Sequence, residues 1–141
     1  MKGPNRWAWF ALVVCAIPGC HGDRKPPGTG ASECARRYFE ALAGRDWPIA
    51  YAALDHASQK SCSLAQFSQR AQSFHASLGF EPTAAIVWAC EEREADATAH
   101  VVLAGARGSN DHRSKEAVML VRSENGWHIV LQPNFGRSMK R

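Results

Sequence analysis

The sequence predicts an α+β fold in which three helices come first and a four-stranded antiparallel sheet follows. Between residues 32 and 79, apolar residues recur at the three- and four-residue spacing of helices that are buried on one side. After Pro82 the period changes to two and β-branched residues become frequent, which is typical of strands. Helices that precede a run of neighbouring strands favour a layered arrangement, with the helices packed on one face of the sheet.

Three helices are expected in the first half of this region. The first begins at the capping residue Ser32 and ends at Gly44, and the second begins at Asp46. The third begins at Ser63, where Gln66 completes a capping box, and continues to residue 78. The apolar stripes of these helices consist of Ala35, Tyr38, Phe39 and Leu42, then Trp47, Ala50, Tyr51 and Leu54, and then Leu64, Phe67, Ala71, Phe74 and Leu78.

Four strands are expected after the helices, over residues 83–93, 97–107, 115–123 and 127–132. An acidic turn over residues 94–96 joins the first two, and the segment GSNDHRS, residues 108–114, is expected to be a loop. A three-residue turn with a left-handed Gly126 joins the last two strands. This register predicts a buried face of Met119, Val121, Trp127, Ile129 and Leu131, and it leaves Val118, Leu120 and Val130 on the opposite face.

Residues 1–19 are typical of a cleaved export signal. Lys2 and Arg6 precede an apolar stretch over residues 7–17, which is shorter than the roughly 20 residues that a membrane-spanning helix needs. Ile17, Gly19 and Cys20 resemble the cleavage site of bacterial lipoproteins. The resemblance implies cleavage between Gly19 and Cys20 and a lipid on the Cys20 sulfur, which anchors the protein in a membrane. A secreted protein without lipid and an uncleaved membrane anchor are the alternatives.

The rest of the chain is expected to divide into three parts. Residues 20–31 are rich in Pro, Gly and charge and are expected to form a flexible stalk. Residues 32–135 form the folded domain, and residues 136–141 form a disordered tail. The whole chain has a formal net charge of +4, but two of its basic residues lie in the signal segment. Because the remainder is nearly neutral and has no basic cluster, we expect no nucleic-acid partner.

Three short motifs of the domain resemble the nuclear transport factor 2-like fold: ARRYFEAL at residues 35–42, GRDW at 44–47 and ENGWHIVL at 124–131. The resemblance covers about residues 32–133 and implies a cystatin-like cone, in which a curved sheet wraps a pair of helices. Similar domains occur on small lipoproteins of the bacterial envelope, and their open sheet face often pairs with a second copy. Val118, Leu120 and Val130 are the residues expected on that face.

Three cysteines remain in the domain, Cys34, Cys62 and Cys90. Export implies an oxidising compartment, where at most one internal disulfide can form among three thiols. A helix rises by about 1.5 Å per residue and a strand by about 3.3 Å, so the chain travels similar distances up the third helix and back along the first strand. This geometry favours a Cys62–Cys90 bridge, and three buried thiols are the alternative.

No catalytic or metal-binding motif stands out. None of the six histidines pairs with another at the spacing of metal ligands, so we expect no metal and no cofactor and assign no catalytic residue. His56 is expected at the end of the second helix, where it would stabilise that terminus. The abundant aromatic residues are expected in the core or around a cavity, and the candidate lining residues are Tyr38, Trp47, Trp88 and Trp127.

These observations predict a lipid-anchored protein of the bacterial cell envelope, on the periplasmic or extracellular side of a membrane, with a small noncatalytic binding or assembly domain. Its expected partners are the membrane, a second copy through the sheet face, and a small apolar ligand in the cone. One alternative is a small proton-transfer enzyme, because ketosteroid isomerase and scytalone dehydratase share this cone. None of their catalytic residues can be matched to positions of this sequence. Another alternative is a purely structural spacer or a stress-associated component of the envelope.

Overall fold

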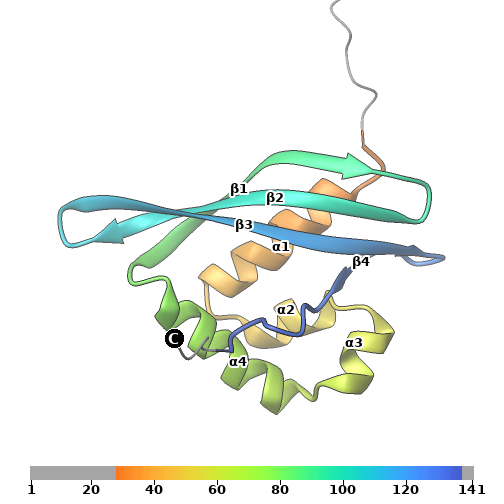
Figure 1. Cartoon of the computed structure of the whole chain (residues 1–141), viewed down its shortest axis with the longest axis horizontal. Coiled ribbons are helices and arrows are strands. Elements are labelled where there is room, and N and C mark those ends of the chain that lie inside the picture. The colour runs from red at the N-terminus through yellow and green to blue at the C-terminus, as the bar shows by residue number, and fades with distance from the viewer. Residues whose placement is uncertain (1–27, 138–141) are drawn as a thin grey trace, which may run out of the picture.

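A computed structural model describes residues 28–137 of the chain, which contain four helices and four strands. The helices are α1 (Ala31–Ala43), α2 (Trp47–Ala52), α3 (His56–Ser61) and α4 (Leu64–Ser77). The strands β1 (Glu81–Glu92), β2 (Asp96–Arg107), β3 (Asn110–Ser123) and β4 (Gly126–Val130) form one antiparallel sheet in that order. In Figure 1 the sheet forms one layer, α1 lies against it, and α2, α3 and α4 lie further from it. The α+β class and the strand order are therefore confirmed.

The predicted signal segment, the lipidation site Cys20, most of the predicted stalk and the last four residues lie outside the described residues. Within residues 28–137, no helix has both the length and the apolar character needed to cross a membrane.

The structure has an additional helix, α3, between the predicted second and third helices, so the expected number of three was wrong. After α2 the chain pairs with β4: the Ile129 N–H donates to the Ala53 carbonyl, and the Asp55 N–H donates to the Ile129 carbonyl, both at 2.8 Å. Asp55 then caps α3 by accepting from the Ser58 N–H at 3.1 Å. His56 therefore begins α3 and does not end a helix. Backbone pairing with a distant strand leaves no mark in the helical periodicity.

The start of α1 is capped from the sheet. Gly30, not Ser32, occupies the capping position and supplies no side chain. The Glu92 carboxylate of β1 accepts from the Thr29 N–H at 2.8 Å, from the Thr29 hydroxyl at 2.9 Å and from the first N–H of α1 at 3.2 Å. The Trp127 indole N–H donates to the Thr29 hydroxyl at 2.9 Å. These bonds fix the point at which the predicted stalk meets the domain.

The cap makes a pH-dependent contribution to stability. Hydrogen bonding, first of all from the Thr29 N–H, holds the pKa of Glu92 below its ordinary value. The ionised carboxylate therefore stabilises the fold above the unfolded pKa of about 4.3. This stabilisation is lost as the pH falls through the lower pKa of the folded state. We expect Glu92→Gln to lower the melting temperature at neutral pH by a few degrees, and the difference to shrink below a pH of about 4.

Thermal unfolding of wild type and Glu92→Gln over a pH series checks this expectation. Glu94→Gln is the control, because Glu94 is exposed in the adjacent turn. Equal melting temperatures for the two variants at neutral pH would mean that Glu92 does not act as a cap.

The β2–β3 hairpin is longer than expected, because most of the predicted loop over residues 108–114 is strand. Arg107 pairs with Asn110, so the turn contains only Gly108 and Ser109. Gly108 has a φ of 62°, which glycine adopts without strain. Residues 110–113 are exposed. Backbone pairing alone extends the hairpin here, so no apolar alternation marks it in the sequence.

The predicted register of the last two strands was wrong by one residue. The turn after Ser123 contains two residues rather than three, and it places Leu120 opposite Ile129. Both of these side chains are fully buried, whereas Met119 is 51% exposed. Side chains alternate along a strand, so a shift of one residue moves each of them to the other face. Val118 and Leu120, expected on the open face, therefore belong to the core.

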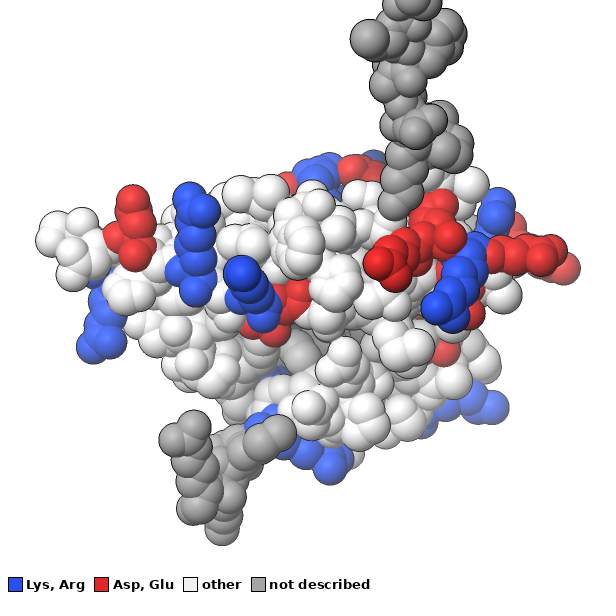
Figure 2. Space-filling model, turned by 45° about the horizontal axis from the view of Figure 1, so that its top comes forward, with Lys and Arg blue, Asp and Glu red and all other residues white. Residues whose placement is uncertain are grey.

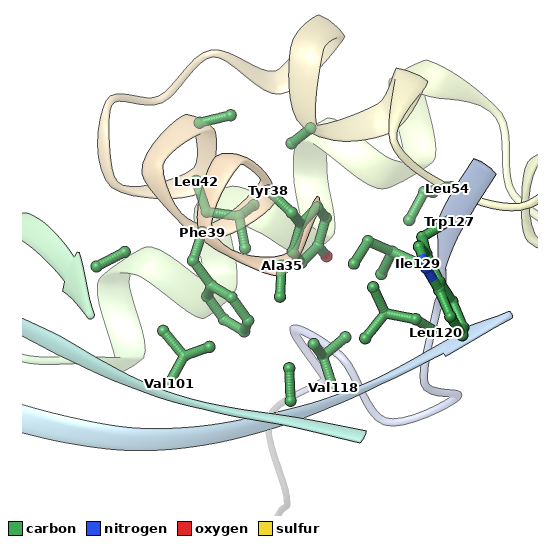
Figure 3. Packing of buried hydrophobic residues seen from close by; sticks show 14 of the residues in the cluster. Ala35, Tyr38, Phe39, Leu42, Leu54, Val101, Val118, Leu120, Trp127 and Ile129 are labelled. Atoms are coloured by element: carbon green, nitrogen blue, oxygen red, sulfur yellow. The ribbon is translucent and has the colours of Figure 1, made fainter. Parts of the chain in front are cut away.

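The core lies between α1 and the inner face of the sheet, and β4 closes one side of it (Figure 3). Tyr38 and Trp127 belong to the core, and Trp47 packs against it. Trp88 does not: it is 58% exposed on the outer face of β1. The main buried side chains that Figure 3 labels are Ala35, Tyr38, Phe39, Leu42, Leu54, Val101, Val118, Leu120, Trp127 and Ile129. These side chains form one contiguous core within residues 28–137.

The structure does not form the predicted Cys62–Cys90 bridge. Cys62 is a buried free thiol at the end of α3, and its S–H points to the Ser63 carbonyl at 3.7 Å. The predicted equal heights assumed that α4 and β1 run side by side. Instead β1 packs along α1, and α4 lies on the other side of α1 (Figure 1). Cys34 is also a free thiol, and burial raises its pKa, which disfavours the reactive thiolate.

Candidate ligand pocket

A cavity of about 510 Å³ opens between α4, β3 and the C-terminal segment 131–137. Tyr38 and Phe39 of α1 form its inner end, where both side chains are buried. Small-molecule pockets have volumes of roughly 300–1,000 Å³. A ligand of ordinary small-molecule size therefore fits this cavity.

Aromatic and aliphatic side chains form the deeper walls. Phe74 of α4 and Phe135 of the C-terminal segment both line the cavity, and their ring centroids lie 5.2 Å apart. Val118 of β3 and Leu131 after β4 add aliphatic surface. Transfer of an apolar ligand from water to such walls is favourable, by a free energy of about 25 cal/mol per Å² of apolar surface buried. The walls therefore favour an apolar ligand.

Polar side chains lie mainly at the exposed rim of the cavity. They are Ser73 and Ser77 of α4 and Gln132, Asn134 and Arg137 of the C-terminal segment. Glu116 is placed deeper, because it lies opposite the fully buried Val101 on the inner face of the sheet. The Ser114 hydroxyl donates to the Glu116 carboxylate at 2.6 Å. Among the described residues, neither Glu116 nor Arg137 forms an ion pair.

Arg70 of α4 holds the C-terminal wall of the cavity in place. Its Nε donates to the Phe135 carbonyl at 2.7 Å, and its Nη2 donates to the Gln132 and Pro133 carbonyls at 3.0 Å each. The guanidinium carbon lies 5.9 Å from the centre of the Phe135 ring. Gly136 follows with a φ of 63°, and a Cβ there would lie 1.9 Å from the Arg70 carbonyl oxygen. Gly136 therefore packs against α4, although the sequence predicted that the disordered tail begins at this residue.

Tyr38 brings a phenol to the inner end of the cavity. The residue is 3% exposed, and in Figure 3 its ring points from α1 into the space between the helices and the sheet. Burial raises the pKa of the Tyr38 phenol well above its ordinary value. The phenol therefore stays protonated and presents a hydrogen-bond donor.

Of the four aromatic residues predicted to line a pocket, Tyr38 alone lines this cavity. Trp47 lies beside His75, with ring centroids 6.3 Å apart. Trp127 lines a second cavity of about 480 Å³ beside the start of α1, and Tyr38 contributes to that cavity as well. Arg70, Phe135 and Glu116 were not predicted. The sequence marks only the neighbourhood of Phe135, because Gly136 follows it. A glycine at this position indicates a turn within the fold as readily as the start of a disordered tail.

A second polar cluster joins the end of α4 to the start of β1. His75 is 8% exposed, its Nε2 has no hydrogen bond, and this atom lies 3.6 Å from a Glu81 carboxylate oxygen. Arg45 pairs with the other Glu81 oxygen at 3.0 Å. Residues 28–137 contain no group of three or more His, Cys, Asp or Glu side chains that could hold a metal ion. The cluster therefore connects two elements and lies outside the cavity.

No protein family and no curated protein matches the sequence. Solved structures do match the fold. One is a Campylobacter jejuni protein described as an NTF2-like transpeptidase, with 14% identity and a TM-score of 0.59 over 71% of this chain and 96% of that one. Another is a SEC-C motif containing protein from Rhodopseudomonas palustris, with 13% identity and a TM-score of 0.52 over 70% of this chain and 73% of that one. At such identities the likeness shows the fold alone, and the fold is nuclear transport factor 2-like.

Proposed function

We propose that the protein is a lipid-anchored component of the bacterial cell envelope whose domain binds a small apolar ligand without transforming it. The cavity of about 510 Å³ is the observation that carries the binding role. Its inner end and walls contain the rings of Phe39, Phe74 and Phe135, and its rim is polar. This combination of apolar walls and few polar groups is typical of ligand sites.

Filling the mouth of the cavity tests the binding role. Ser73 is exposed on α4 and lines the cavity, so Ser73→Trp obstructs entry without changing the core. Native mass spectrometry of protein purified from its own cells is expected to detect a bound small molecule in wild type and not in this variant. Gln69→Trp is the matched control, because Gln69 is exposed on the same helix and does not line the cavity. Equal amounts of bound molecule in wild type and Ser73→Trp would contradict the assignment.

The membrane anchor rests on Cys20, which follows Gly19 at the end of the predicted signal. Cys15 is the other cysteine of the predicted signal segment, but it follows the bulky Val14. We expect cells fed with labelled palmitate to label the wild-type chain and the Cys15→Ser variant, and not the Cys20→Ser variant. An unlabelled wild-type chain would contradict the lipid anchor and leave a secreted protein or an uncleaved membrane anchor.

A proton-transfer enzyme is the second candidate, and one observation favours it: a carboxylic acid, Glu116, and a phenol, Tyr38, line the same cavity. Such a pair can move a proton between two carbons of a bound substrate. Conversion of a β,γ-unsaturated ketone into its conjugated isomer, followed by absorbance, would support this candidate if Glu116→Gln abolished it. No conversion above the buffer rate would dismiss it for this substrate class.

The outer face of the sheet is the surface that we propose for pairing with a second copy. Ile86, Trp88 and Met119 are 52%, 58% and 51% exposed on this face. Figure 2 views it obliquely and shows few charged residues at its centre and charged residues toward its ends. Both ends carry charges of both signs: Arg113, Lys115 and Asp111 lie toward the β2–β3 turn, and Glu91, Arg93 and Asp96 lie toward the β1–β2 turn. A two-fold axis through the centre of this face would bring the three exposed apolar side chains of one copy against those of the other.

We expect Trp88→Glu to abolish this pairing, because it places a charge in the centre of an apolar contact. Sedimentation of the domain at high micromolar concentration should show a dimer for wild type and a monomer for the variant. Ile49→Glu is the control: Ile49 is also 58% exposed but lies on α2. A wild-type monomer at this concentration would refute the pairing.

A further inference from the structure

The chain contains two tyrosines, and their hydroxyl groups differ in hydrogen bonding. The Tyr51 hydroxyl donates to the Gln59 carbonyl at 3.1 Å and lies 2.9 Å from the Cys62 carbonyl. The Tyr38 hydroxyl forms no hydrogen bond with any described residue, although the residue is only 3% exposed. Buried tyrosine hydroxyls normally have a partner. Among the described residues, His75 Nε2 is the fully enclosed polar side-chain atom without a partner, so the Tyr38 hydroxyl is reachable by solvent. Tyr38 therefore offers a donor that has no partner among the described residues.

The surroundings of Tyr38 define what can pair with it. Tyr38 lies at the inner end of the cavity, next to Phe39, whose ring centroid is 5.3 Å away in an edge-on arrangement. Phe74 and Val118 line the same cavity. A charged ligand group would lose its hydration in such a place, which is costly, and Glu116 in the same cavity would also repel an anion. A neutral oxygen that accepts one hydrogen bond avoids that cost.

The nearby charge favours the same kind of group. The positive charge of Arg70 acts on the Tyr38 phenol, where it opposes the effect of burial on the pKa. Arg70 is already committed to three backbone carbonyls and does not itself need a ligand. Its field stabilises a partial negative charge at this end of the cavity and disfavours a cation.

Building on the proposed function, we propose that the ligand is a neutral, mostly apolar molecule with an acceptor oxygen at its buried end, and that the Tyr38 hydroxyl donates to this oxygen. The ligand class then includes aryl and alkyl ketones, aldehydes and esters of moderate size. Hydrocarbons of the same shape bind more weakly, because they leave the phenol unpaired. Tyr38 is thus the residue that determines specificity within an otherwise apolar site.

A thermodynamic cycle with two probes tests this proposal. The probes are 2-acetylnaphthalene and 2-isopropenylnaphthalene, which have the same shape and differ in a C=O against a C=CH₂ group. Titrations use the chain that begins at residue 20 with Cys20→Ser, so that neither lipid nor detergent competes for the cavity. In Tyr38→Phe, the preference for the ketone over the hydrocarbon is expected to fall by about 3- to 10-fold relative to wild type.

Tyr51→Phe is the matched control, because it removes a hydroxyl that bonds elsewhere and should leave the preference unchanged. Tyr38→Phe removes no hydrogen bond to the described protein, so it is expected to fold with an unchanged melting temperature. If wild type and Tyr38→Phe have the same preference, the hydroxyl does not bind the ligand, and the proposal falls while the cavity remains a binding site. If neither probe binds wild type up to its solubility limit, the proposed function falls as well.

Discussion

Leu120→Ala is expected to lower the free energy of unfolding by about 2–5 kcal/mol, which is the range for removing a large aliphatic side chain from a well-packed core. Leu120 is fully buried on β3 and faces Ile129 across the strand pair. The alanine leaves a cavity between α1 and the sheet that neighbouring side chains fill only partly. Urea unfolding, followed by the change in tryptophan fluorescence, measures this loss.

Met119→Ala is the matched comparison, because Met119 is adjacent in sequence and lies on the other face of the strand. Met119 is 51% exposed, so its truncation is expected to change the free energy of unfolding by less than about 0.5 kcal/mol. The three-residue turn expected from the sequence puts Met119 inside and Leu120 outside. A larger loss for Met119→Ala than for Leu120→Ala would therefore show that the strand is paired in that other register.

Arg70→Ala is expected to lower the free energy of unfolding by about 3 kcal/mol. Three backbone carbonyls lose a charged donor in this variant and can bond only to water instead. The Phe135 ring also loses the guanidinium beside it. The C-terminal wall of the cavity is expected to loosen, so the backbone amides of residues 134–137 should exchange with deuterated water faster than in wild type. Ligand binding should weaken in the same variant, because Phe135 lines the cavity.

Arg70→Lys separates the charge from the geometry of these bonds. A lysine keeps the positive charge but lacks the planar fork that reaches several carbonyls at once. We expect an intermediate loss of stability for this variant and almost none for Arg113→Ala, because Arg113 is exposed on β3. If Arg70→Ala has the stability and exchange rates of wild type, the C-terminal segment is held by something other than Arg70.

Local signals predicted much of the fold. Ser63 and Gln66 form the expected capping box, with bonds of 3.2 and 3.0 Å, and the change of period after Pro82 marks the transition to the sheet. The misplaced elements depend on distant partners. Leu54 forms a parallel bridge to Ile129, which interrupts the helical stretch, and Glu92 caps a helix that begins 61 residues earlier. Neither partner can be identified from the residues that surround the element.

The candidate site was less accessible to prediction from the sequence. The aromatic stripe of α1 predicted that Tyr38 is inward-facing, which was correct, but not that its hydroxyl lacks a partner. Glu116 lies between Lys115 and Ala117 in a strand whose register depends on the length of a turn. Arg70 acts on Phe135, 65 residues away, so its role follows only from the way the chain closes on itself.

The central claim is that an apolar ligand occupies the cavity beside α4. Its most direct test is a nuclear magnetic resonance titration of the ¹⁵N-labelled chain from residue 20, carrying Cys20→Ser, with 2-acetylnaphthalene. We predict that the amide signals of Ser77, Ala117, Leu131 and Gly136, which line the cavity, shift in a saturable manner, and that Ser73→Trp abolishes the shifts. Saturable shifts confined to Ile86 and its neighbours on the outer sheet face, or no shifts at all, would contradict the claim.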